Sequence, residues 1–90
     1  MEHEMTASDI ALKVRQVISD VLGIPIEKVQ EDASLASDLA ADSLDAVEVV
    51  MELEEAFQVV LSNFDRSTVQ TVSGLILHIT RALNADLVPS

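Results

Sequence analysis

Apolar residues recur at helical spacing in three separate segments of this chain. Intervals of three and four residues place side chains on one face of an α-helix, so each segment predicts a helix that buries one face. The three stripes are Ile10, Val14, Val17 and Val21, then Ala46, Val49, Val50, Leu53 and Phe57, then Val72, Leu75, Ile76, Ile79 and Leu83. This pattern predicts an all-α fold in which helices pack around a shared core.

Capping residues and helix breakers give the expected limits of the first helix. Thr6 or Ser8 is a suitable N-cap, whereas Gly23 and then Pro25 end the helix. Residues 24–41 predict a long loop with one helical turn at about Glu27–Val29. Regularly spaced apolar residues should pack this loop against the domain, namely Ile26, Val29, Leu35 and Leu39.

The remaining limits complete a four-helix bundle. A second helix begins at Asp42 or Ser43 and runs to about Phe57, without Gly or Pro inside it. A brief third helix is expected from Ser62 or Asn63 to about Val69, and Thr71 caps a fourth that ends near Leu83. The prediction is one domain over residues 1–90, with three longer helices, one short helix and loose ends at 1–6 and 85–90.

Charge and composition narrow the classes of partner. The 90 residues carry a net charge of −11, and no Lys or Arg lies between Lys28 and Arg66. Such an acidic chain is not expected to bind nucleic acid, and its apolar runs are too short to span a membrane. The absence of Cys excludes disulfides and Cys-based metal sites. We expect a cytoplasmic monomer that binds proteins with basic patches and has no metal site of its own.

The predicted second helix carries a second apolar stripe beside its core face. Leu44, Val47 and Met51 form this stripe. Carboxylates flank it on both edges, among them Asp45, Glu48, Glu52, Glu54 and Glu55. An apolar strip with a charged rim is typical of a docking surface, but neighbouring elements could equally cover it. The spacing alone leaves both interpretations open.

Ser43 lies at the start of the same helix, next to a suitable cap at Asp42. A phosphate attached there would meet the free N–H groups and the positive end of the helix dipole. A serine in this position is also a common helix cap without further function. Catalysis by Ser43 is not expected, because the G-x-S-x-G motif and a preceding strand are both missing.

The run Asp-Leu-Ala-Ala-Asp-Ser-Leu-Asp at residues 38–45 resembles the phosphopantetheine attachment motif of acyl carrier proteins, D-L-G-A-D-S-L-D. The resemblance extends over residues 10–83 and implies a four-helix bundle. It implies that Ser43 carries 4'-phosphopantetheine, placed there by a phosphopantetheinyl transferase, and that Asp42 contacts this transferase and its metal. It also assigns partner contacts to the apolar Leu44, Val47 and Met51 and to the acidic Asp45, Glu48, Glu54 and Glu55.

The resemblance therefore predicts a carrier and not an enzyme. The expected role is delivery of thioester-linked acyl groups to acyl-processing enzymes in fatty acid or related lipid biosynthesis. Two departures keep open a specialised carrier for polyketide, aminoacyl or unusual lipid cargo. Ala40 replaces the usual Gly, and residues 61–68 lack the usual Pro and dense acids. A non-catalytic helical adaptor that binds a basic protein is a further alternative.

Overall fold

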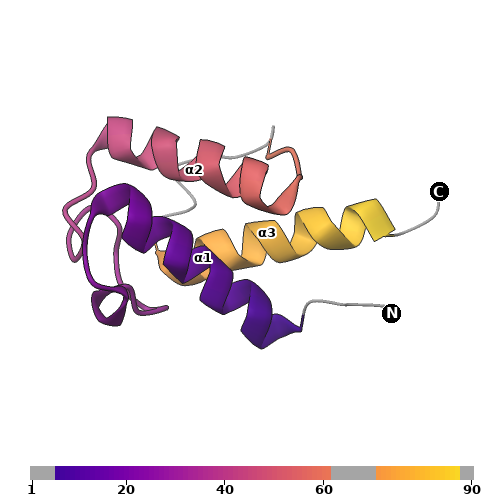
Figure 1. The fold of residues 1–90 in the computed structure, drawn as a ribbon, viewed down its shortest axis with the longest axis horizontal. Helices are drawn as coiled ribbons and strands as arrows, with labels where there is room; N and C mark the ends of the chain where they lie inside the picture. The colour runs from indigo at the N-terminus through magenta and orange to yellow at the C-terminus, as the bar shows by residue number, and fades with distance from the viewer. Residues whose placement is uncertain (1–5, 62–70, 88–90) are drawn as a thin grey trace.

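The all-α class expected from the sequence is confirmed by the arrangement of the helices (Figure 1). The computed structural model describes residues 6–61 and 71–87, the last four of these as backbone only. It contains α1 (Ala7–Leu22), the 3-10 helix η1 (Ile26–Lys28), α2 (Ser43–Phe57) and α3 (Val72–Leu87). The short helix expected at 62–69 and the ends 1–5 and 88–90 lie outside the described residues.

Local hydrogen bonds set both ends of α1. The Thr6 hydroxyl accepts the Asp9 N–H at 3.1 Å, and the Asp9 carboxylate accepts the Thr6 N–H at 3.1 Å. Thr6 rather than Ser8 is therefore the N-cap, so the loose start expected at 1–6 does not include Thr6. At the other end Gly23 adopts φ 67°, and its N–H donates to the Ser19 carbonyl at 2.9 Å. Glycine takes this left-handed conformation without steric cost.

The last helix begins where the sequence predicts and ends later. The Thr71 hydroxyl accepts the Gly74 N–H at 3.2 Å and caps the first turn of α3. The helix continues to Leu87, so the expected end near Leu83 and the loose tail from residue 85 are wrong up to that point. No Gly or Pro interrupts residues 84–87, and Pro89 is the first residue that opposes helix continuation.

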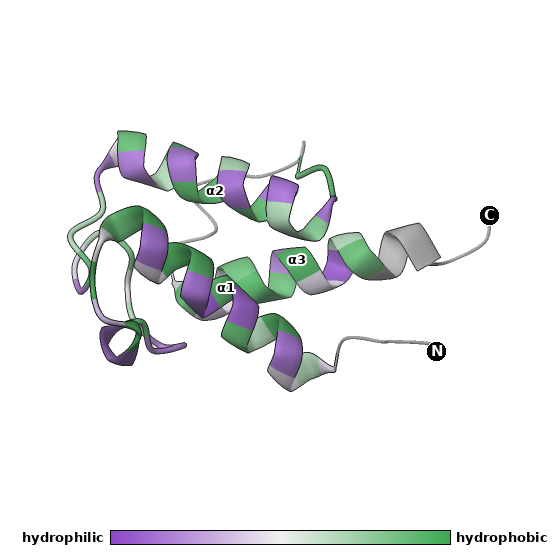
Figure 2. Cartoon of the chain, viewed as in Figure 1, coloured by the Kyte–Doolittle hydropathy of each residue, from purple (hydrophilic) through white to green (hydrophobic). Residues whose placement is uncertain are grey.

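The three helices bury most of the stripes that their spacing predicts, but the buried face of α1 is Ile10, Val14 and Ile18, and the predicted Val17 and Val21 are only half-buried. In Figure 1, α1 passes in front of α3, and α2 lies above them in this view. The helix α1 contacts both α2 and α3. Each helix carries both hydrophobic and hydrophilic residues (Figure 2), and the buried apolar residues of all three form one core. The fully buried side chains at the centre are Val14, Ile18, Val29, Val49, Leu53, Val72, Leu75 and Ile79. Burial of these apolar surfaces provides the main driving force for folding.

Packing and an arginine hold the long loop before α2 in place. Val29, Leu35 and Leu39 are buried, as their spacing predicts, whereas Ile26 is only half-buried. The Arg15 guanidinium on α1 donates to the Val29 carbonyl at 2.6 Å and to the Ile26 carbonyl at 3.3 Å. The helical turn expected at Glu27–Val29 is present one residue earlier, as η1. The loop is thus an ordered support for the start of α2.

Ala40 occupies a backbone conformation that favours glycine. Its φ is 56°, in the left-handed region, at the position where the attachment motif usually has Gly. A Cβ in this conformation costs about 1–2 kcal/mol. The position therefore needs positive φ, and the alanine stores strain three residues before Ser43.

We expect Ala40→Gly to stabilise the domain by about 1 kcal/mol, because the relief of strain exceeds the entropy that glycine adds to the unfolded chain. Urea denaturation measures this change through the unfolding midpoint. Ala41→Gly is the matched control, since Ala41 does not share the positive φ and packs against the core. Lower stability in Ala40→Gly would contradict the strain.

Candidate functional site

Ser43 is the first residue of α2, and its side chain is exposed. The cap of this helix is formed by its neighbours. The Asp42 carboxylate accepts the Asp45 N–H at 2.8 Å, and the Asp45 carboxylate accepts the Asp42 N–H at 3.3 Å. Asp42 is therefore the N-cap, and the local interpretation of Ser43 as the cap is wrong. The exposed serine side chain lies at the tip of a helix whose capping box is made by other residues.

The environment of Ser43 suits a phosphate ester. The start of α2 provides the positive end of a helix dipole over a 15-residue helix. Backbone N–H groups at a helix start hydrogen-bond phosphate oxygens, and Ser43 is an exposed residue at this helix start. Within the described residues, no cluster of His, Asp or Glu side chains is arranged to hold a metal ion. The residues fit a covalently attached phosphate group.

The second apolar stripe of α2 is uncovered by the described residues. Leu44 is 70% exposed, Met51 61% and Val47 43%. The core face of the same helix is buried at Val49, Leu53 and Phe57. Figure 2 shows that hydrophobic and hydrophilic residues alternate along α2. Of the two interpretations left open by spacing, the described structure favours an accessible surface.

The acidic residues predicted as partner contacts differ in their exposure and in their hydrogen bonds. Glu48 and Glu55 are exposed. Asp45 is half-buried and belongs to the helix cap. Glu54 is also half-buried, and its carboxylate accepts the Leu61 N–H at 2.7 Å. The Glu54 side chain thus ties α2 to the segment that follows it, a role that spacing on a helical projection does not reveal.

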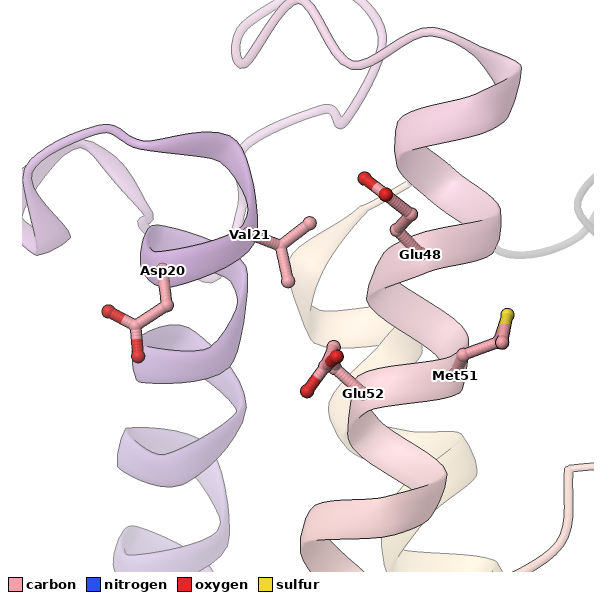
Figure 3. A pocket seen from close by; sticks show the side chains of 5 residues that line it. All are labelled: Asp20, Val21, Glu48, Met51 and Glu52. Atoms are coloured by element: carbon pink, nitrogen blue, oxygen red, sulfur yellow. The ribbon is translucent and has the colours of Figure 1, made fainter.

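A groove between α1 and α2 adds residues that sequence reasoning missed. Its lining consists of Asp20, Val21, Glu48, Met51 and Glu52. In Figure 3, Val21 points from α1 toward α2, the Glu52 carboxylate points from α2 toward α1, and Met51 points away from α1. Asp20 and Val21 belong to the first helix, and no local pattern marks them as neighbours of α2. The acidic character of the α2 surface therefore continues onto the end of α1.

Comparison with known proteins identifies the family. The family described as "Phosphopantetheine attachment site" matches residues 12–79. The chain is 44% identical over 75 residues to the "Acyl carrier protein" of Sinorhizobium fredii (strain NBRC 101917 / NGR234), which covers 83% of this chain and 96% of the relative. The "Acyl carrier protein AcpP" of Rhizobium meliloti (strain 1021) has the same identity and coverage.

The chain belongs to the phosphopantetheine-binding acyl carrier protein family. It is a non-catalytic carrier of thioester intermediates, and its domain contains a phosphopantetheine attachment site. Attachment of this group requires a transferase, which is one partner of the protein. Among the described residues, no helix has the length and apolar content needed to cross a membrane.

Proposed function

We propose that Ser43 is the attachment point, and that the chain carries acyl groups as thioesters on a 4'-phosphopantetheine arm at this residue. The observation that carries the proposal is the exposed serine at the first position of α2, inside the motif at residues 38–45, next to a cap made by Asp42 and Asp45. The arm supplies the thiol that bears the cargo. The protein supplies an accessible hydroxyl and the positive end of a helix beside it.

The exposed stripe of α2 is the proposed docking surface for client enzymes and for the transferase. Leu44, Val47 and Met51 provide apolar contact area, and the exposed Glu48 and Glu55 attract basic side chains. Asp42 and Asp45 would add charge close to Ser43. Glu54 contributes less than its neighbours, because it is half-buried and one of its oxygens is bonded to Leu61. Charge attraction of this kind speeds association more than it prolongs the complex.

Salt is expected to weaken binding of the transferase to this surface. Exposed charges are screened over about 10 Å at 0.1 M salt and over about 3 Å at 1 M. The association rate constant, measured by stopped-flow fluorescence with labelled transferase, should fall steeply over this range. The dissociation rate should change less. An association rate that is insensitive to salt would contradict the electrostatic part of the docking proposal.

Fatty acid or related lipid biosynthesis in the cytoplasm is the proposed setting. The similarity to two proteins named acyl carrier protein supports it. A specialised carrier for polyketide, aminoacyl or unusual lipid cargo is the second candidate, favoured by the sequence of residues 61–68, which lacks the usual Pro and dense acids. Both candidates use the same attachment chemistry. They differ in the group that would be found on the arm.

Mass spectrometry tests the proposal directly. Incubation of the purified chain with coenzyme A, magnesium and a broad-specificity phosphopantetheinyl transferase should add the mass of one phosphopantetheine. Fragmentation should locate this addition at Ser43. A chain that stays unmodified beside a control carrier that is loaded, or one modified at another serine, would overturn the assignment. The unmodified result would favour a helical adaptor that needs no arm.

A further inference from the structure

Asp38 opens the attachment motif, and its exposed side chain is hydrogen-bonded within its own loop. Its carboxylate accepts the Ser34 N–H at 2.7 Å, and its own N–H donates to the Ser34 carbonyl at 2.9 Å. The Ser34 hydroxyl accepts the Ser37 N–H at 3.2 Å, and the Ser34 carbonyl also accepts the Leu39 N–H at 3.1 Å. These bonds close residues 34–39 into a compact turn. We call this segment the Asp38 turn.

The Asp38 turn is joined to the start of α3. Ser34 forms an isolated antiparallel bridge with Thr71, and the Val72 N–H donates to the Ala33 carbonyl at 3.1 Å. The Ser73 N–H donates to the Glu31 carbonyl at 2.8 Å. These donors are N–H groups of the first helical turn, which have no partner within the helix. The turn is therefore anchored on a helix of the core rather than suspended in solvent.

The same turn is joined to the start of α2. The Leu35 carbonyl accepts the Ala41 N–H at 2.8 Å, and Ala41 directly precedes the cap at Asp42. Between them Ala40 holds its left-handed conformation, with φ 56°. Such a conformation persists only where the surrounding structure determines it. The loop is thus joined to the start of α3 at Glu31, Ala33 and Ser34, and to the start of α2 through the bond between Leu35 and Ala41.

We propose that Asp38 is a positioning residue for the loading of Ser43, which rests on the proposed attachment at that serine. The Asp38 carboxylate closes the turn that fixes the direction in which α2 begins. A misplacement of about 1 Å far from the reacting atoms can cost about a hundredfold in rate. The turn needs an acceptor oxygen at residue 38 and does not need its charge. A direct role of Asp38 as an acidic contact for the transferase would need the charge.

Two substitutions separate these roles in a steady-state assay with coenzyme A, magnesium and the transferase. Asp38→Asn keeps an acceptor oxygen and removes the charge, whereas Asp38→Ala removes both. We expect kcat/KM for loading to fall about ten- to a hundredfold in Asp38→Ala, mainly in kcat, and to stay within about threefold of wild type in Asp38→Asn. Asp32→Ala is the matched control for charge loss, because Asp32 is an exposed acid of the same loop.

Several results would overturn the proposal. Loading of Asp38→Ala at the wild-type rate would show that Asp38 has no role in the loading of Ser43. Equal loss in both variants, expressed in KM and abolished by high salt, would assign Asp38 to direct charge contact. If Asp38→Ala does not fold, the hydrogen exchange of the Ser34 amide in Asp38→Asn decides whether the turn is kept. Retained protection at Ser34 with retained loading supports positioning, whereas lost protection with unchanged loading refutes it. Failure of the wild-type chain to load would instead refute the attachment site itself.

Discussion

Ser43→Ala is expected to abolish loading while leaving the fold intact. The hydroxyl oxygen of Ser43 is the proposed bond-forming atom, so its removal leaves nothing to modify. The helix should not suffer, because Asp42 and Asp45 make the cap and alanine is a good helix former. We expect the mass gain after incubation with the transferase to vanish. The free energy of unfolding should change by less than about 0.5 kcal/mol.

A second serine provides the control for this experiment. Ser8→Ala removes an exposed hydroxyl from the first turn of α1, outside both the Asp38 turn and the attachment motif, so it should leave both loading and stability unchanged. A residual mass gain in Ser43→Ala would show that another side chain accepts the group. A loss of stability above about 1 kcal/mol would show instead that Ser43 has a structural role in the helix start. The two measurements therefore separate chemistry from folding.

The largest effect on stability is expected from Leu53→Ala. Leu53 is 0% exposed in the second half of α2, on the face that packs into the core. Truncation of a fully buried leucine removes its transfer free energy and leaves a cavity, at a cost of about 2–5 kcal/mol. Small domains have about 5–15 kcal/mol of stability in total. Urea denaturation should therefore give a much lower midpoint, with part of the population unfolded if the domain lies at the weak end of this range.

Leu44→Ala is the matched control, since it is the same substitution in the same helix. Leu44 is 70% exposed, so folding removes little of its apolar surface from water. Its truncation should change the free energy of unfolding by less than about 0.5 kcal/mol. It should instead weaken binding of the transferase to the α2 stripe. Equal destabilisation by both substitutions would mean that the stripe is covered in solution. The proposal that it is a docking surface would then be wrong.

The elements of the fold were largely predictable because their signals are local. Helical spacing marks the buried faces of α2 and α3 and, on α1, Ile10 and Val14 but not Ile18; Gly23 with Pro25 marks the end of α1. The motif at residues 38–45 placed Ser43 at the start of α2. The helix α3 ends later than the predicted Leu83, because the apolar stripe stops there while no residue before Pro89 opposes a helix.

Parts of the candidate site could not be predicted, because they depend on contacts between distant segments. A helical projection placed Glu54 on the docking rim, and only the path of the chain after α2 brings Leu61 to its carboxylate. The groove that joins Asp20 and Val21 to α2 exists because α1 packs there. The left-handed conformation of Ala40 follows from the anchored loop and not from its own preference, since alanine disfavours positive φ.

By itself, the amino-acid sequence determined which segments become helices, which faces of them are apolar, and which serine stands at the tip of the second helix. These properties arise from hydrogen bonds and side-chain spacing within a few residues. Only the tertiary structure decided that the stripe of Leu44, Val47 and Met51 stays uncovered by the described residues, and that Arg15 on α1 bonds to the loop at the Val29 carbonyl. Exposure and long-range hydrogen bonding depend on which elements pack together, and local spacing carries no information about that.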